Sequence, residues 1–233
     1  MKASSTVRDG KEAKRPVKEE AKRPVKEEAK RSVKEEEKPY DREYFDRWYR
    51  RDASRIEGPS ALRRRVALAV AMAERFLERP IRSALDVGCG EGRWRAELLR
   101  LRPKLHYQGV EPSPYTVKRF GKRRNIVQGS FAQLATLNIE GQADLVICAD
   151  VLHYLEQAEL TAGLPALVRA TGGLAYLELL TSDEEVEGDQ RALKLRTPSF
   201  YQKLLSSSGL TSVGCHGWLA PGLADAPAAL ERR

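Results

Sequence analysis

The stretch Ser83-Ala-Leu-Asp-Val-Gly-Cys-Gly-Glu-Gly92 decides the fold. Its first five residues are mostly apolar and predict a short buried strand, and the three alternate glycines then turn the chain into a helix. A strand–turn–helix step of this kind offers free backbone N–H groups and a surface without side chains, against which a ligand can lie. Glycine spacing is a weak signal by itself. Two acidic residues make the indication of a ligand-binding turn more specific. These are Asp86, two residues before the first glycine, and Glu111, which ends the next apolar run.

The pattern acid-x-Gly-x-Gly-x-Gly, carried by Asp86, Gly88, Gly90 and Gly92, resembles the first motif of the class I S-adenosylmethionine (SAM)-dependent methyltransferases. SAM carries a sulfonium and an ammonium group and no phosphate, so a carboxylate suits it where a pyrophosphate would be repelled. A dinucleotide-binding loop has the spacing G-x-G-x-x-G, and Arg93 stands where that pattern has its third glycine. The resemblance spans roughly residues 40–220.

Strands and helices alternate along the chain and predict an α/β fold with a doubly wound, mostly parallel sheet, Rossmann-like as in class I methyltransferases. Gly163 and Pro165 are expected to kink or divide one helix. Few residues follow Gly209, so the last strand is expected at 218–220 or is missing. Strands are predicted at 83–87, 107–110, 125–128, 143–149, 174–180 and 210–213, and helices at 61–77, 93–101, 114–120, 156–170 and 199–208.

The net charge of the chain is shared between a short N-terminal segment and the rest of the chain, and the N-terminal segment has the higher charge per residue. The whole chain of 233 residues has a formal net charge of +8. Residues 1–39 hold 13 Lys and Arg against 9 Asp and Glu, which is +4, and residues 40–233 hold 28 against 24, which is also +4. We therefore predict a charged tail at 1–39 and a SAM-dependent methyltransferase domain at 40–233, whose mild charge weakens any general argument for nucleic-acid binding.

The tail contains an eight-residue repeat between residues 14 and 37, Lys-Arg-Pro-Val-Lys-Glu-Glu-Ala and close variants. One valine per repeat cannot offset the entropy of ordering, so a disordered N-terminus is expected. Two interpretations stay open: a solubilising tail, or an arm that contacts nucleic acid or a partner. The interleaved glutamates argue against strong phosphate binding.

The sequence also gives indications of the protein's subcellular location. The apolar stretches are too short for a membrane span, and the charged N-terminus lacks the apolar core of a signal peptide. Cys89, Cys148 and Cys215 have no C-x-x-C spacing, which argues against a zinc site or a disulfide framework. We expect a cytoplasmic protein without a metal, and the sequence does not indicate its oligomeric state.

Two helices precede the glycine stretch. Aromatic residues follow one helical stripe after Asp41, a predicted N-cap; this stripe either packs on the core or, by the resemblance, closes over the cofactor as a lid. The helix at 61–77 is expected to start after Ser60, with Arg63–Arg65 and Glu74 facing solvent. The aromatic stripe consists of Tyr40, Tyr44, Phe45, Trp48 and Tyr49.

The resemblance implies a set of cofactor-binding residues at the carboxyl ends of the strands. The Gly88 and Gly90 backbone would contact the methionine part of SAM, Glu111 would accept both ribose hydroxyls, and Pro112 would pack on the adenine. Many relatives have an acid after the third strand; here Ser130 can bond the adenine and Phe131 can stack on it. The full set is Asp86, Gly88, Cys89, Gly90, Glu111, Pro112, Ser130, Phe131, Asp150 and Val151.

Three candidate catalytic residues follow the fourth and fifth strands: His153, Tyr154 and Glu178. Methyl transfer needs an aligned nucleophile in a dry site and needs a general base only when the acceptor keeps its proton. His153 is the best candidate base, but it can instead shape the site or cap the next helix. Glu178, in an apolar strand, can bind a cationic acceptor such as an amine, or pair with an Arg or Lys.

These observations predict methyl transfer from SAM to a small molecule. The segment Asp150-Val-Leu-His-Tyr154 is not the Asn-Pro-Pro-Tyr type that acts on flipped bases or planar amides. The alternatives are an RNA or protein methyltransferase that uses the basic turn at 118–124 and the N-terminal arm, and a SAM-binding module without catalysis. A nucleotide-dependent oxidoreductase is the least favoured interpretation.

Overall fold

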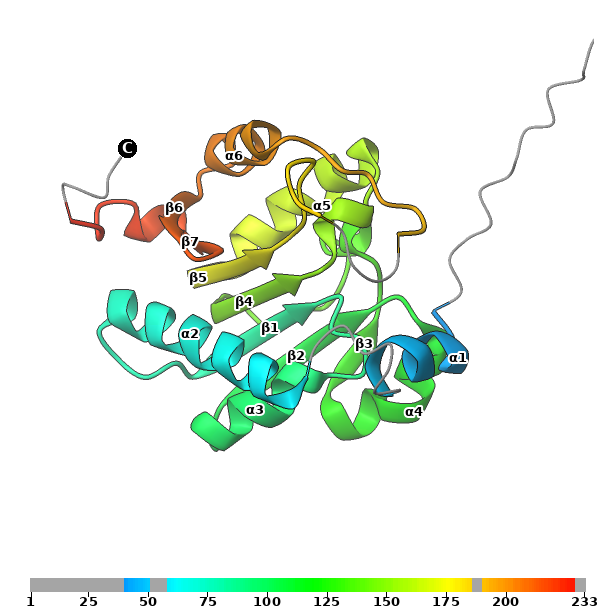
Figure 1. Cartoon of the computed structure of the whole chain (residues 1–233). Helices are drawn as coiled ribbons and strands as arrows, with labels where there is room; N and C mark the ends of the chain where they lie inside the picture. Colours follow the sequence, from blue (N-terminus) through cyan, green and yellow to red (C-terminus); the bar gives the residue numbers. More distant parts are fainter. Residues whose placement is uncertain (1–39, 51–57, 186–189, 229–233) are drawn as a thin grey trace, which may run out of the picture. The chain divides into compact units, whose positions relative to one another are not determined.

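A computed structural model describes residues 40–50, 58–185 and 190–228. The predicted tail at 1–39 lies outside the described residues. The strands form one seven-stranded sheet with the order β3-β2-β1-β4-β5-β7-β6. Figure 1 shows the twist of this sheet. Every strand pair is parallel except those of β7, which is antiparallel to both neighbours. The strands are β1 (Ser83–Val87), β2 (His106–Glu111), β3 (Ile126–Gln128), β4 (Ala143–Ala149), β5 (Thr171–Glu178), β6 (Thr211–Gly214) and β7 (Gly217–Leu219). The doubly wound prediction is confirmed, and the last strand is present.

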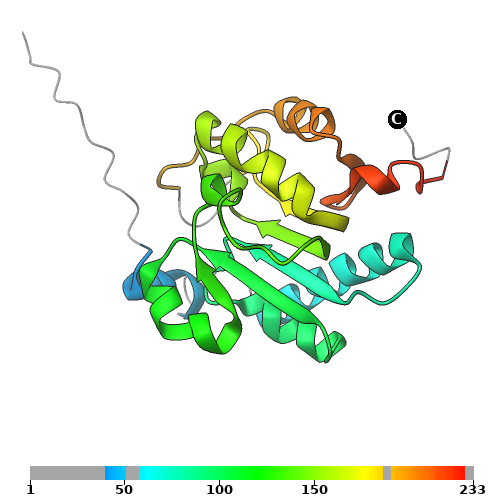
Figure 2. The same cartoon turned by 180° about the vertical axis from the view of Figure 1, so that it is seen from behind.

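Helices cover both faces of the sheet (Figures 1 and 2). One core cluster joins α2 and α3 to the sheet, and a second joins α5 and α6 to the opposite face. No described helix is long and apolar enough to cross a membrane. The helices are α1 (Arg42–Phe45), a π-helical turn η1 (Asp46–Arg50), α2 (Pro59–Leu77), α3 (Arg93–Leu101), α4 (Pro114–Arg124), α5 (Gln157–Ala170) and α6 (Pro198–Ser207), with short 3-10 turns η2 (Phe131–Gln133), η3 (Leu152–Tyr154) and η4 (Pro221–Leu223).

Helix boundaries differ from the predicted ones where proline is involved. α2 begins at Pro59 after the extended Gly58, because proline at the first helical position needs no N–H partner; the expected start after Ser60 was wrong. α5 runs unbroken through Pro165, so the predicted division was wrong as well. Pro165 is exposed, and water can therefore satisfy the carbonyl that loses its helical partner.

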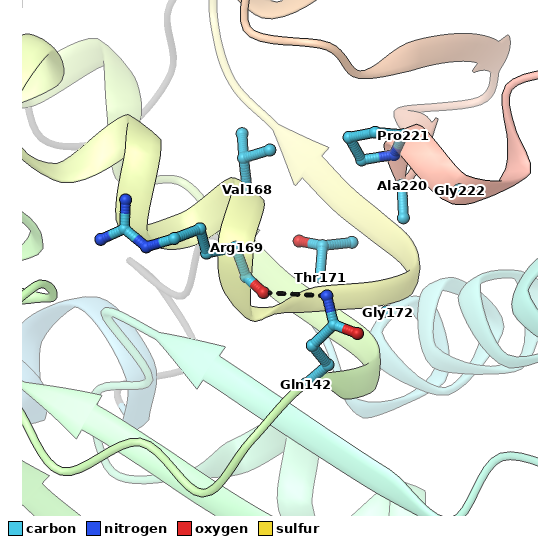
Figure 3. Close-up of a pocket in the computed structure, with 8 residues that line it drawn as sticks. All are labelled: Gln142, Val168, Arg169, Thr171, Gly172, Ala220, Pro221 and Gly222. Carbon is cyan, nitrogen blue, oxygen red and sulfur yellow. Dashed lines mark hydrogen bonds between the residues drawn. The ribbon is translucent and has the colours of Figure 1, made fainter.

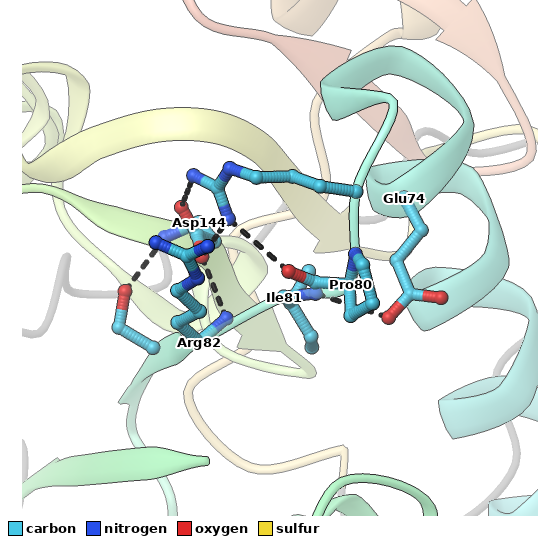
Figure 4. A network of polar contacts seen from close by, with 7 residues as sticks. Glu74, Pro80, Ile81, Arg82 and Asp144 are labelled. Carbon is cyan, nitrogen blue, oxygen red and sulfur yellow. Dashed lines mark hydrogen bonds and ion pairs between the residues drawn. The ribbon is translucent and has the colours of Figure 1, made fainter. Parts of the chain in front are cut away.

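Polar contacts join the amino ends of β1 and β4 to the C-terminal end of α2 and to the segment that follows it (Figure 4). Asp144 accepts two hydrogen bonds from the Arg79 guanidinium, at 2.8 and 2.7 Å, and one from the Arg82 backbone N–H at 2.6 Å. Glu74 accepts from the Ile81 N–H at 3.0 Å and pairs with Arg102. Glu74 was expected to face solvent; it instead connects α2 to the segment that enters β1.

A shallow hollow of about 300 Å³ opens at this same amino edge (Figure 3). In it the Gln142 amide donates to the Arg169 carbonyl at 3.2 Å. Ligands of doubly wound sheets bind at the carboxyl ends of the strands, so this hollow lies at the wrong edge for the predicted cofactor. Its lining residues are Gln142, Val168, Arg169, Thr171, Gly172, Ala220, Pro221 and Gly222.

Candidate functional site

The glycine turn after β1 has a backbone that only glycine adopts easily. Gly88, Gly90 and Gly92 all have φ between 52° and 74°. The N–H groups of Gly88 and Cys89 donate to the Val110 carbonyl, at 2.8 and 3.1 Å. The Gly90 N–H donates to Glu111 and the Gly92 N–H to the Cys89 carbonyl at 2.8 Å, so the expectation of free N–H groups was wrong for all four residues. What the turn offers a ligand is a main chain without side chains.

Glu111 ends β2 and links it to the glycine turn. One carboxylate oxygen accepts the Gly90 N–H at 2.9 Å and the other accepts the Ser113 N–H at 3.0 Å. The residue is only 4% exposed. Burial raises its pKa, and the two N–H donors oppose that shift because they stabilise the carboxylate. Each oxygen retains a lone pair for a further donor, such as a hydroxyl.

Asp86 lies beneath the turn and is 2% exposed. Its carboxylate accepts a hydrogen bond from the Tyr107 hydroxyl at 2.8 Å. Burial raises the pKa of Asp86 from 3.8 to about 7; the Tyr107 bond opposes this shift and the nearby Glu111 charge adds to it. Burial also raises the pKa of the neighbouring Cys89 thiol, which is therefore not a reactive thiolate.

The aromatic segment before α2 lies over the glycine turn. Phe45 is buried, and a side chain at Gly90 would begin 3.3 Å from its ring. Phe45 also stacks on Tyr115 of α4 at a centroid distance of 6.0 Å, and the Ser113 hydroxyl donates to the Tyr40 carbonyl at 2.5 Å. Asp41 caps α1 as predicted. The prediction that the aromatic residues share one helical stripe was wrong, because the π-helical turn η1 replaces the α-helix after Phe45. The Tyr49 side chain lies outside the described residues.

The predicted adenine residues separate in the structure. Pro112 is exposed beside Glu111, and Ser130 is the N-cap of η2. Phe131 is instead 4% exposed and packs so closely on Gly163 of α5 that a methyl group at Gly163 would clash with its ring at 2.3 Å. Phe131 thus belongs to the core and cannot stack on an adenine in this arrangement.

Residues after β4 contact the glycine turn directly. Asp150 has φ 60°, a left-handed conformation, and its N–H donates to the Glu178 carbonyl at 2.9 Å. Val151 packs on Gly88: a Cβ built at Gly88 would lie 2.4 Å from the Val151 Cγ2. This contact brings the carboxyl end of β4 against the turn after β1, where the strand order reverses.

His153 connects two parts of the loop that follows β5. It is 1% exposed, and its Nδ1 accepts the Leu180 N–H at 3.0 Å. Its carbonyl accepts the Lys194 N–H at 2.7 Å. Tyr154 is half-buried with its ring 4.4 Å from the imidazole. These contacts favour the interpretation in which His153 shapes the site.

Glu178 pairs with an arginine, one of the two roles considered for it. The Arg65 guanidinium of α2 donates to the Glu178 carboxylate and lies 3.7 Å from Asp150. Arg65 was expected to face solvent, and its side chain is instead 23% exposed. The signal was present in the sequence: Arg65 follows Leu62 by three residues and precedes Ala69 by four, which places it on the buried stripe of α2.

The remaining histidines and candidate metal ligands lie apart. His106 pairs with Glu140 at 3.5 Å, and His216 contacts the Tyr176 ring. Within residues 40–50, 58–185 and 190–228, no group of three His, Cys, Asp or Glu side chains could hold a metal ion. The side-chain-free turn and the Glu111 carboxylate fit a nucleoside carrying positive charge better than one carrying phosphates.

Comparisons with known proteins agree with this fold. A family model described as a methyltransferase domain matches residues 85–174. The fold is similar to the plantazolicin methyltransferase BamL, solved with SAH (TM-score 0.53, 15% identity, 66% of this chain and 66% of that one). It is also similar to DesVI of Streptomyces venezuelae (TM-score 0.53, 16% identity, 64% of this chain and 84% of that one). A third similar structure is the sugar N-methyltransferase KedS8 of a Streptoalloteichus species (TM-score 0.51, 18% identity, 63% of this chain and 78% of that one).

The comparison with curated protein sequences gave no match. The chain spans about two thirds of the length of BamL. The three similar structures are all below 20% identical to this chain, so the similarity concerns the fold. The methyltransferase match includes most of β1, the glycine turn and the strands on either side of the switch point. The match identifies a methyltransferase domain at residues 85–174, and the strand order of the sheet agrees with it.

Proposed function

We propose that this protein methylates a small molecule at the edge formed by the carboxyl ends of β1, β4 and β5. The observation that carries the proposal is the packing of Val151 on Gly88, which brings the side chains after β4 against the glycine turn. A methyl donor on the turn and an acceptor beside Asp150 and Glu178 would then be neighbours. Proximity and alignment supply most of the rate enhancement of an in-line displacement.

The residues present fit SAM. The turn from Gly88 to Gly90 would contact the methionine part through its bare main chain, Glu111 would accept the ribose hydroxyls with its remaining lone pairs, and Pro112 and Ser130 would lie by the adenine. Asp86, below the turn, would ionise beside a positive charge. SAM, when bound, supplies an electrophilic methyl carbon on a positively charged sulfur.

The acceptor side would be shaped by the residues after β4 and β5. His153 positions the loop between Leu180 and Lys194 through its ring and its carbonyl, and Tyr154 lines its flank. Glu178 and Asp150 present carboxylates at the strand ends. In this proposal no general base is required of His153, because its Nδ1 is already used as an acceptor.

Two further observations support a small acceptor. The segment Asp150-Val-Leu-His-Tyr154 lacks the planar-amide motif expected for bases and glutamine side chains. Among the proteins with a similar fold are a sugar N-methyltransferase and a methyltransferase of plantazolicin.

The test is to incubate the protein with methyl-labelled SAM and a metabolite extract, and to separate products by size. The proposal predicts label in small molecules, lost in the Glu111→Ala variant because that variant no longer binds SAM. Label confined to RNA or protein would overturn it. SAM binding without any labelled product would identify a module that does not catalyse.

A second candidate, RNA methylation, is favoured by the exposed basic side chains on the last turns of α4: Lys118, Arg119, Lys122 and Arg123. Deleting residues 1–39 and measuring RNA affinity against salt concentration distinguishes the two functions. An RNA enzyme that uses the arm would lose affinity and salt dependence. A small-molecule enzyme would keep its turnover.

A further inference from the structure

Basic side chains gather where the end of α4 lies beside the start of α3. The Arg124 guanidinium donates to the carbonyl of Glu91, two residues before α3. The Arg119 and Arg123 guanidinium groups lie around the buried Phe120 ring, 5.4 and 5.7 Å from its centroid. Arg124 lies over the same ring at 4.1 Å. We call the following six side chains the α3–α4 basic patch: Arg95, Lys118, Arg119, Lys122, Arg123 and Arg124.

The α3–α4 basic patch has little negative charge around it. None of its six members forms an ion pair with a carboxylate of the residues that the structure describes. Residues 112–139 hold five Lys and Arg and no Asp or Glu. Burial lowers the pKa of Arg124; the nearby Glu91 charge opposes this shift, and the charges of Arg123 and Arg95 add to it. Cations that repel one another in this way are stabilised when an anion lies between them.

The spacing of the cations on α4 points the same way. Lys118 and Lys122 are four residues apart, as are Arg119 and Arg123, and all four side chains are exposed on one stripe of the helix. Like charges at this spacing destabilise a helix. The helix dipole favours cations in the last turn, but it does not account for the two in the turn before. Stability of the helix therefore does not explain the whole stripe.

The charge of the molecule is uneven between the two helical layers. Figures 1 and 2 show α2, α3 and α4 on one side of the sheet and α5 and α6 on the other. The first three helices hold 12 Lys and Arg against 2 Asp and Glu, and the other two hold 2 against 1. Their formal charges are +10 and +1, although residues 40–233 carry only +4 in total. The mild total thus conceals one strongly basic layer, which attracts polyanions.

The chemistry of this face favours a phosphate backbone over other polyanions. No large hydrophobic side chain of α3 or α4 is exposed, and the rings of Trp94 and Phe120 are buried. Protein interfaces are anchored by aromatic and apolar side chains that become buried on binding. Single-stranded nucleic acids are held by bases stacked on exposed rings. A duplex needs neither anchor, since Lys and Arg bind its backbone directly.

From these observations we infer that the α3–α4 basic patch binds the phosphate backbone of a nucleic-acid duplex without reading its sequence. The inference goes beyond the proposed function and does not make the duplex the methyl acceptor. Three exposed acids, Asp183, Glu184 and Glu185, follow β5 on the acceptor side, and they would repel a phosphate backbone there. The second candidate function, by contrast, requires RNA to enter that side.

The first experiment measures, by fluorescence anisotropy, the binding of RNA and DNA duplexes of about 20 base pairs to the full chain over a range of KCl concentrations. The inference predicts binding at low salt, with the logarithm of the affinity falling by roughly 3 to 5 per tenfold rise in salt, because each phosphate contact contributes about 0.9. Binding of both duplexes supports recognition of the backbone alone, and binding of RNA alone supports recognition of an A-form backbone. No binding at low salt, or equally tight binding of polyglutamate with the same number of charges, would overturn the inference.

Variants then locate the contact, because the charged tail at 1–39 is also present in the full chain. The double variant Lys122→Gln/Arg123→Gln should lower the salt dependence by about 2 and weaken duplex binding at least about tenfold. The matched control is Arg169→Gln/Lys203→Gln on α5 and α6, in the opposite layer, and it should leave the salt dependence unchanged. A salt dependence that is unchanged in the first variant, or lowered equally in both, would contradict the assignment.

Methyl-transfer assays separate this inference from the proposed function. Lys122 and Arg123 lie outside the site, so their double variant should label small molecules at the wild-type rate. Label in small molecules without duplex binding would overturn the inference alone. Duplex binding without labelled small molecules would uphold the inference and overturn the proposed function. Label in the duplex itself would contradict the separation of the basic patch from the acceptor side.

Discussion

At the scale of single residues, two buried acids define the cofactor side of the site. Asp86 and Glu111 are both almost fully buried, and their hydrogen-bond donors among the described residues are neutral: the Tyr107 hydroxyl for Asp86, and two backbone N–H groups for Glu111. Buried carboxylates without a cation are costly and are commonly retained for function. In the proposed function, both carboxyl groups lie by a positively charged ligand.

Asp86 should make the stability of the protein depend on pH. Its pKa rises from 3.8 to about 7 on folding, so between those values the unfolded chain has released a proton that the folded chain keeps. The free energy of unfolding therefore falls by up to about 4 kcal/mol as the pH rises from about 4 to about 7, and it is constant above that range. Asp86→Asn should remove this dependence, as urea unfolding at pH 5 to 8.5 would measure. A stability difference between the two proteins that does not change with pH would refute this.

Gly88 tests the contact between the glycine turn and β4. Gly88→Ala imposes a left-handed alanine and also a clash with Val151, whereas Gly141→Ala imposes φ 64° with open space around it. The second variant should cost about 1 to 2 kcal/mol, and the first about 1 to 3 kcal/mol more. Chemical unfolding of both variants measures the difference. Equal costs would mean that Val151 does not press on Gly88.

At the scale of elements, α2 connects the two edges of the sheet. Arg65 reaches the carboxyl ends of β4 and β5, while Glu74, near the C-terminal end of the helix, and Arg79, just beyond it, are bonded to the amino ends of the strands. One helix thus fixes both the charge of the acceptor side and the start of β1. The sequence predicted that this helix exists but not that its charged residues face inward, because stripe counting weighs apolar positions and ignores arginines at the stripe's border.

We expect Asp144 to contribute to the free energy of unfolding through its hydrogen bonds as well as through its charge. Removing it in Asp144→Ala leaves Arg79 and the Arg82 N–H without their acceptor, so we expect a loss of about 2 to 4 kcal/mol. Hydrogen bonds from Arg79 and the backbone lower the pKa of Asp144 against the effect of burial. Its contribution is therefore present at neutral pH and lost as pH falls below the ordinary carboxyl range.

The measurement for Asp144 is a double-mutant cycle with Arg79→Ala, followed by thermal unfolding at pH 3 to 7. A coupling energy near zero, or a stability difference independent of acid pH, would show that the pair does not act as described.

α1 should slow the release of the cofactor. Its Phe45 lies against Gly90 and Tyr115, over the turn that SAM would contact. Phe45→Ala should raise the dissociation rate of SAM several-fold in stopped-flow measurements, since the cover over the turn is reduced. Tyr154→Ala serves as a comparison on the other side of the site. A dissociation rate unchanged by Phe45→Ala would leave α1 with a packing role only.

At the scale of the whole molecule, much of the architecture was readable from local patterns. Strand and helix alternation predicted the sheet, and Asp41 is the N-cap of α1, as predicted. The errors at the helix boundaries were local and involved prolines, whereas those in the site came from contacts between distant residues. Arg65 meets Glu178 across 113 positions, and Phe131 meets Gly163 because η2 packs on α5. Local periodicity can place Arg65 on the buried stripe of α2 but does not identify its partner, so the charged contacts of the site could not be predicted from the sequence.

The central claim is that Glu111 and the bare turn beside it bind SAM. Titration calorimetry of SAM with the wild type, Glu111→Ala and the control Glu140→Gln tests it most directly, since Glu140 is an exposed acid paired with His106. We predict an affinity loss of about 100-fold or more for Glu111→Ala, equivalent to two charged hydrogen bonds, and none for the control. Equal SAM affinity in all three proteins, with each shown to be folded, would contradict the account.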